Sequence, residues 1–121
     1  MKSTKFSVPL HPMKVIYNRH FPPGTFHGIN LFGVVFVQRR WGRMKPHELN
    51  HELIHTRQMV EMGFVGFYVW YGVEWLVRLV QCRWDGEKAY YRIGFEREAY
   101  AQEGNEDYLK RRTWYAWWRY L

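Results

Sequence analysis

Short apolar runs rich in β-branched and aromatic residues mark the first third of the chain. One run covers residues 14–18, and a longer uncharged run covers residues 28–37 with Gly33 inside it. Such side chains favour strands, and a glycine within the run favours a turn. The pattern predicts a strand at 14–18 and two strands that meet near Gly33, together forming a small, mainly antiparallel sheet.

A helical pattern follows the sheet. Pro46 suits the first position of a helix and Gly63 suits its end, so we predict a helix from Pro46 to about Glu61. The basic stretch 39–45 that leads into this helix is typical of a solvated loop.

Residues 62–80 form the most apolar stretch of the chain. Three glycines and the charged residues Glu74 and Arg78 interrupt it, and its uncharged part ends at Val73. The uncharged part is too short for a membrane span, so the stretch predicts a buried or interfacial helix. Glu74 precedes Arg78 by four residues, which is the favourable order for an ion pair on a helix.

Two more helices are expected in the last quarter of the chain. Residues 95–103 have good helix propensity, and Asn105 can cap a last helix that runs to Leu121. The predicted fold class is therefore α+β, with the N-terminal sheet followed by three or four helices. We find neither a repeat nor a linker, which favours a single domain over residues 1–121.

Composition and charge restrict the setting. The chain has 18 Lys and Arg against 11 Asp and Glu, a net charge of +7 that suits anionic membranes, nucleic acid or acidic substrates without selecting one. Cys82 is the only cysteine, which excludes an internal disulfide. The first ten residues lack the apolar run of a signal peptide, so we expect a cytoplasmic protein.

The predicted 46–61 helix carries His-Glu-x-x-His. Two histidines four residues apart lie on one face of a helix and can bind one Zn²⁺ ion, while the intervening glutamate can accept a proton from a water on the metal. The motif occurs in two overlapping frames, which begin at His47 and at His51. The two frames cannot both be the site.

The second frame is favoured because it lies deeper in the helix. His47 and Glu48 fall in the opening turn, where Glu48 complements free backbone N–H groups. We therefore expect His51 and His55 as zinc ligands and Glu52 as the general base.

A catalytic zinc needs a third protein ligand, and the predicted helix at 95–103 offers Glu96 and Glu98. Two residues apart on a helix, these side chains point in different directions, so only one can reach the metal.

The two segments together resemble the gluzincin metallopeptidases. The resemblance rests on His51-Glu-Leu-Ile-His55 followed by Glu96-Arg-Glu-Ala99, and it is closest to the small, soluble minigluzincins. It implies a zincin-like fold and Glu96 as the third ligand. It also implies a substrate-binding strand at or beside residues 34–37. One position departs from the pattern, because related membrane-embedded gluzincins have a supporting Asp where this chain has Tyr100.

The resemblance implies a zinc-dependent peptidase acting on peptides or unfolded proteins. The alternative is a catalytically silent, zinc-stabilised binding module that uses a basic, aromatic surface to contact a membrane or a partner.

The C-terminal residues 110–121 carry four positive charges and no acid, and they are rich in aromatic residues. A helix there would place four apolar side chains on one face: Trp114, Trp117, Trp118 and Leu121. Such a face is typical of core contacts. Peripheral binding to an anionic membrane and insertion into the protein's own cleft are the alternatives, whereas no nucleic-acid motif accompanies the aromatic residues.

Overall fold

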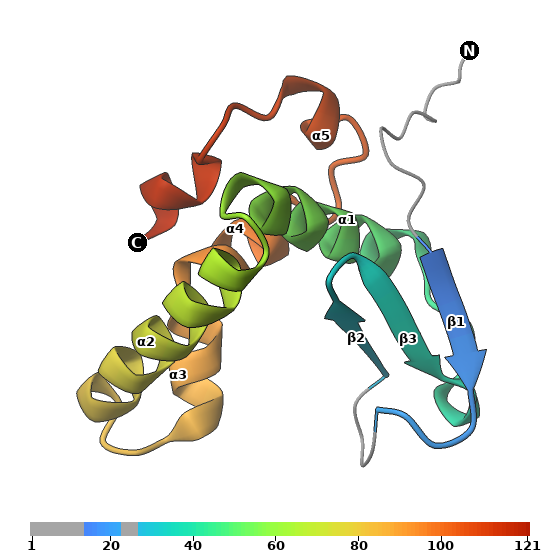
Figure 1. Cartoon of the computed structure of the whole chain (residues 1–121), viewed down its shortest axis with the longest axis horizontal. Helices are drawn as coiled ribbons and strands as arrows, with labels where there is room; N and C mark the ends of the chain where they lie inside the picture. Colours follow the sequence, from blue (N-terminus) through green and yellow to red (C-terminus); the bar gives the residue numbers. More distant parts are fainter. Residues whose placement is uncertain (1–13, 23–26) are drawn as a thin grey trace. The chain divides into compact units, whose positions relative to one another are not determined.

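The computed structural model describes residues 14–22 and 27–121 and has an α+β architecture (Figure 1). The chain forms two compact units, of which the first ends at Met44 and the second comprises Lys45–Leu121. The first unit contains the sheet and the second contains the long helices. A single domain over residues 1–121 stays a prediction.

The described part of the first unit forms a three-stranded sheet in the order β1-β3-β2. The strands are β1 (Lys14–Asn18), β2 (Gly28–Leu31) and β3 (Val34–Gln38). The predicted strand at 14–18 and the pair meeting near Gly33 are confirmed. Phe32 and Gly33 turn the chain between β2 and β3 with φ angles of 53° and 88°.

The expectation of a mainly antiparallel sheet was wrong. β2 and β3 are antiparallel, but β1 and β3 are parallel, so the sheet is mixed. β3 is both the central and the most buried strand, with Val35 and Val37 fully inaccessible. Since β3 is paired on both sides, a peptide can extend the sheet only beside β1 or β2.

The second unit begins with α1 (Pro46–Glu61), which starts and ends as predicted. Glu48 accepts a hydrogen bond from the Lys45 N–H at 2.7 Å and so completes the first turn. After α1, Gly63 has a φ of 68°, a left-handed conformation that suits glycine.

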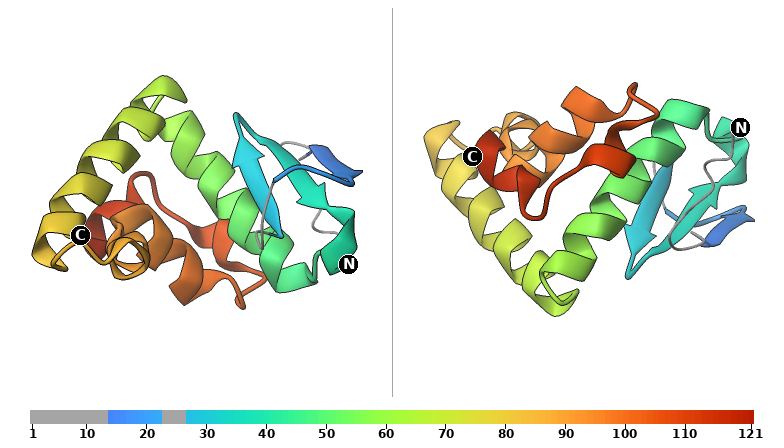
Figure 2. Two further views of the ribbon diagram at one scale, coloured as in Figure 1. Left: turned by 90° about the horizontal axis from the view of Figure 1, so that it is seen from below. Right: turned by 90° about the horizontal axis from the view of Figure 1, so that it is seen from above.

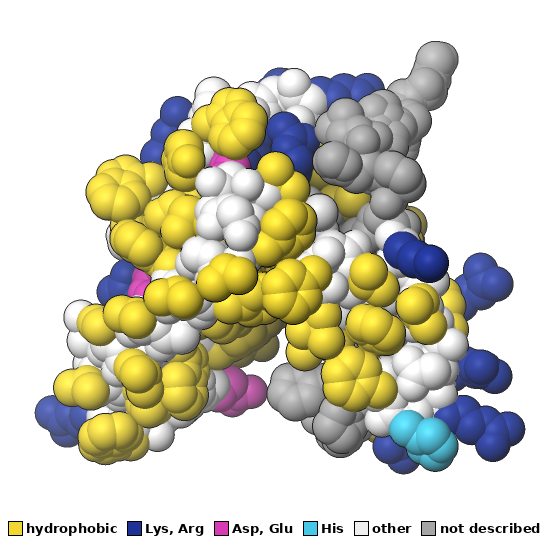
Figure 3. Space-filling model, viewed as in Figure 1, with side chains coloured by type: hydrophobic (Ala, Val, Ile, Leu, Met, Phe, Trp, Pro, Cys, Tyr) yellow, Lys and Arg dark blue, Asp and Glu magenta, His cyan; other side chains and the backbone are white. Residues whose placement is uncertain are grey.

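α2 (Val65–Gln81) buries one face and exposes the other. Phe67, Glu74 and Leu79 are buried. Figure 3 shows hydrophobic side chains on the surface of α2. The exposed apolar residues of this helix are Val65, Val69, Val73, Leu76, Val77 and Val80. The predicted ion pair is present, because Glu74 Oε2 lies 2.9 Å from Arg78 Nη2. No helix in the described ranges has both the length and the hydrophobicity needed to cross a membrane.

The predicted last helix was wrong. After α3 (Gly86–Arg92) and α4 (Gly94–Gln102), the chain forms only a short helix, α5 (Tyr108–Arg111), and a 3₁₀ segment, η2 (Ala116–Tyr120). The chain becomes extended at Arg112, whose side chain turns inward to Glu61 and Glu98, and left-handed at Tyr115.

The C-terminal segment supplies three apolar side chains to the core, and they are Tyr108, Ala116 and Trp117. η2 lies beside α4 in both views of Figure 2, and the Trp117 ring lies 4.8 Å from that of Phe95. One core cluster consists of Met59, Phe67, Ile93, Phe95 and Trp117, and a second consists of Ile54, Ala99 and Tyr108. Of the predicted apolar face, only Trp117 is buried, whereas Trp114, Trp118 and Leu121 are exposed.

Candidate metal centre

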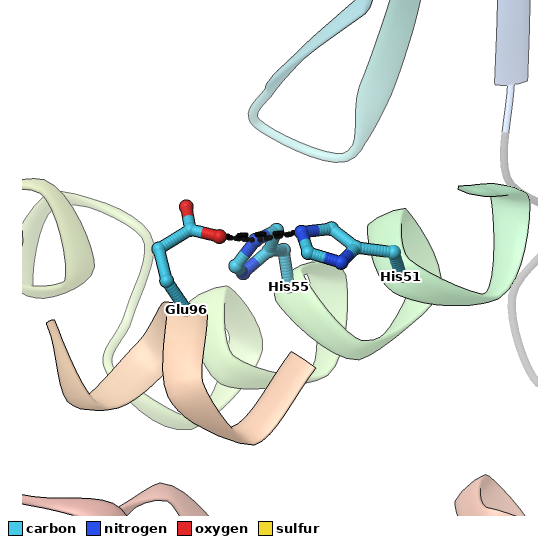
Figure 4. Close-up of side chains that lie close together, drawn as sticks. All are labelled: His51, His55 and Glu96. Carbon is cyan, nitrogen blue, oxygen red and sulfur yellow. Dashed lines mark hydrogen bonds and ion pairs between the residues drawn. The ribbon is translucent and has the colours of Figure 1, made fainter. Parts of the chain in front are cut away.

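Three buried side chains converge between α1 and α4 (Figure 4). α1 presents His51 and His55 on one face, as expected for residues four apart. α4 presents Glu96, whose Oε1 lies 3.2 Å from His51 Nε2 and 3.1 Å from His55 Nε2. The two Nε2 atoms are 3.1 Å apart. The three atoms therefore form a nearly equilateral triangle.

The size of this triangle fits a tetrahedral metal ion. Ligand atoms at about 2.0–2.1 Å from such an ion are about 3.3 Å apart. The observed separations of 3.1–3.2 Å are close to that value. The buried cluster can thus hold a metal ion without rearrangement of α1 or α4.

Hydrogen bonds behind the two histidines set their tautomers. His51 Nδ1 lies 2.8 Å from a carboxylate oxygen of Glu103, and His55 Nδ1 lies 2.8 Å from Gln58 Oε1. Both partners are acceptors, so each Nδ1 carries the proton and donates it. In the neutral rings both Nε2 lone pairs then point at Glu96. Metal-bound histidines commonly donate their other ring N–H to an acceptor in this way.

Gln58 is itself held in one orientation. Its amide nitrogen donates to the Phe95 carbonyl at 3.0 Å and to Glu98 Oε1 at 2.9 Å. The amide oxygen must therefore face His55, which fixes the position of that ring.

Tyr71 from α2 supports the third donor. Its hydroxyl donates to Glu96 Oε2 at 2.8 Å, which leaves Oε1 for the histidines. Burial, together with the charge of Glu96, raises the pKa of Tyr71 far above its usual range, so this phenol stays a donor.

The charges of the cluster are strongly coupled. Burial alone would lower the pKa of His55, but Glu96, with smaller contributions from Glu52 and Gln58, outweighs burial and raises it to about 9. Burial alone would raise the pKa of Glu96, but His55 and His51 hold it well below its usual range. The cluster therefore favours a carboxylate beside a cation, and a bound metal ion would take the place of the proton on His55.

The structure distinguishes Glu96 from Glu98, which the local sequence pattern had made equal candidates for the third ligand. Glu98 is fully buried on another side of α4. It bonds to Gln58, Tyr108 and Arg112. Its carboxylate therefore binds other core residues and is not one of the donors that converge with the histidines.

The remaining residues of the two overlapping frames are also placed. Glu52 is half-buried, and its charge acts on both His55 and Tyr71, so it lies near the cluster. His47 is exposed in the first turn of α1 and is not part of the candidate metal centre. The structure therefore brings together the donors of the second frame.

Sequence reasoning missed Gln58, Tyr71 and Glu103. Gln58 lies three residues after His55 on the same helix, and this spacing is a usable signal. Glu103 lies seven residues after Glu96, which is two helical turns and so the same face. Tyr71 comes from α2, and no local pattern connects it to the cluster.

Replacing Glu103 by alanine is expected to weaken metal affinity about 10–100-fold, because His51 loses the acceptor that orients its ring. Competition between the protein and a chelator for zinc measures this affinity. Glu106→Ala is the matched control, because it removes an exposed carboxylate three residues away. Equal affinities for the two variants would show that Glu103 does not support the site.

Comparisons with protein-family models, with curated proteins and with solved structures found no match to this chain.

Proposed function

We propose that this protein is a zinc-dependent peptidase of the gluzincin type with a zincin-like fold. The observation that carries the proposal is the triangle of His51 Nε2, His55 Nε2 and Glu96 Oε1 beside Glu52. Two imidazoles and one carboxylate, with one position left open, form a donor set used by catalytic zinc sites.

Zinc is the favoured ion on the basis of donor type and geometry. Imidazole nitrogen suits zinc better than calcium or magnesium, which prefer oxygen ligands. The short edges of the triangle also suit tetrahedral coordination.

Tyr100 stands where the resemblance implies a supporting Asp, and Glu103 can supply the carboxylate instead. The Tyr100 ring packs against that of His51, with ring centroids 4.5 Å apart, so this position supports the histidine by packing. The carboxylate that related proteins place at this position is supplied here by Glu103, almost one helical turn later. Replacement of the usual Asp therefore does not leave His51 without an acidic partner.

The chemistry assigns one role to each group. Zinc in this position would polarise a peptide carbonyl and make water a nucleophile near neutral pH. Glu52 would accept the proton of the attacking water and later deliver it to the leaving amine. His51, His55 and Glu96 hold their donor atoms in place, and their outer partners Glu103, Gln58 and Tyr71 keep them oriented.

Glu52→Gln tests the catalytic assignment. The variant keeps the size of the side chain but cannot act as a base, so cleavage of an unfolded protein substrate should fall about 10²–10⁴-fold. Zinc content should stay equal to that of the parent protein, because Glu52 is not a ligand. Cleavage is measured by mass spectrometry of the products.

Equal cleavage by the parent protein and the variant would remove Glu52 from the mechanism. Zinc binding without cleavage by either protein would favour the alternative, a zinc-stabilised binding module. A cytoplasmic location remains part of the proposal, as do peptides or unfolded proteins as substrates.

A further inference from the structure

A second group of functional side chains lies in the first unit, at the end of the sheet where β1 and β3 finish. Because these strands are parallel and Asn18 pairs with Gln38, the segments that follow them leave the sheet at the same end. The four residues that begin these segments line an open hollow of about 530 Å³: Arg19, His20, Arg39 and Arg40. Figure 3 shows Lys and Arg side chains and a histidine gathered at this end.

The unit that contains the hollow has a net positive charge. All 11 acidic residues of the chain lie after residue 44, so the net charge of +7 resides in residues 1–44. This unit therefore contains no acidic side chain that could neutralise the three arginines. A solvated loop accounts for the exposed cations within residues 39–45. It does not explain why Arg19 and His20, from a different segment, line the same hollow.

One of the arginines is held in place before any ligand binds. The buried Gln38 side chain donates to the Pro22 carbonyl and accepts a hydrogen bond from Arg40 Nε at 2.8 Å. The Arg40 guanidinium also lies 5.2 Å from the centre of the Trp41 ring. A side chain that is already ordered loses less entropy when it binds a ligand.

We propose that this hollow binds the phosphate headgroup of an anionic phospholipid. Arginine guanidinium groups match phosphate oxygens in pairs, and several around one hollow suit a compact anion. Exposed aromatic rings directly follow the cations, since Phe21 comes after His20 and Trp41 after Arg40. Aromatic rings beside cations are typical of membrane interfaces. A nucleic-acid strand would instead need a track of cations along its backbone.

The test compares two double variants of the full chain that lose the same charge. Arg19→Gln/Arg39→Gln removes two cations from the hollow, while Arg40 keeps its bond to Gln38. Lys14→Gln/Arg43→Gln removes two exposed cations of the same unit that do not line the hollow. Each protein is sedimented with vesicles of phosphatidylglycerol in phosphatidylcholine and with vesicles of phosphatidylcholine alone.

The parent protein should sediment only with the anionic vesicles. The hollow variant should bind them about 25-fold more weakly, at about fivefold for each cation, and the control variant less than about threefold more weakly. Circular dichroism should be unchanged in both variants. Millimolar inorganic phosphate should compete for the parent protein and not for the hollow variant.

Three results would overturn the proposal. Equal losses in the two variants would mean diffuse attraction and no built site. Binding of inorganic phosphate without binding to vesicles would exclude a lipid as the source of the phosphate. Tighter binding to single-stranded RNA than to vesicles at the same salt concentration, lost in the hollow variant, would assign the hollow to nucleic acid.

Discussion

Replacing Arg112 by methionine is expected to lower the free energy of unfolding by roughly 3–5 kcal/mol. The Arg112 side chain is 1% exposed and bridges Glu61 and Glu98, whose side chains are 3% and 0% exposed. Methionine fills similar space but leaves two carboxylates inside the protein without their cation. Burial alone would lower the pKa of Arg112, whereas the two carboxylates raise it, so the guanidinium is charged at any pH of interest.

Arg111→Met is the matched control for this prediction. Arg111 is the preceding residue and is exposed, so its loss should change stability by less than about 0.5 kcal/mol. Urea denaturation of both variants at one fixed zinc concentration measures the difference. Similar midpoints for the two variants would show that the buried ion pairs contribute little to the fold.

The network around Arg112 also reaches the candidate metal centre. Glu98 accepts hydrogen bonds from Arg112 and from Gln58, and Gln58 in turn accepts one from the His55 ring. The C-terminal segment is therefore connected through three side chains to an expected metal ligand.

Local elements could be predicted well from the sequence. Strand and helix patterns depend on neighbouring residues, so β1, the β2–β3 turn and the bounds of α1 followed from side-chain type and from Pro46 and Gly63. The pairing of His51 with His55 followed in the same way, because residues four apart share one helix face.

Features that depend on distant contacts could not be predicted. The mixed sheet arises because β1 joins the far side of β3, and no local pattern specifies that choice. The predicted C-terminal helix is interrupted at Arg112, where the backbone is extended and the side chain reaches the distant carboxylates of Glu61 and Glu98. The choice of Glu96 over Glu98 came from the family resemblance, and the structure shows its cause in the network that holds Glu98.

The second large effect is expected at the proposed metal ligands. Removing the imidazole of His55 leaves two donors in the triangle, so His55→Ala should abolish stoichiometric zinc binding. His47→Ala removes a histidine from the same helix, but its side chain is exposed and lies outside the triangle. This variant should bind zinc as the parent protein does. Comparing the two variants therefore shows which overlapping frame binds zinc, because each variant loses one histidine from the same helix.

Zinc content per protein chain, measured by mass spectrometry of the metal after dialysis, tests the central claim most directly. We predict one zinc ion in the parent protein, one in His47→Ala and none in His55→Ala, with circular dichroism confirming that all three remain helical. Zinc lost from His47→Ala and kept by His55→Ala would move the site by one helical turn and make Glu48 the base. A parent protein that retains no zinc would contradict the account as a whole.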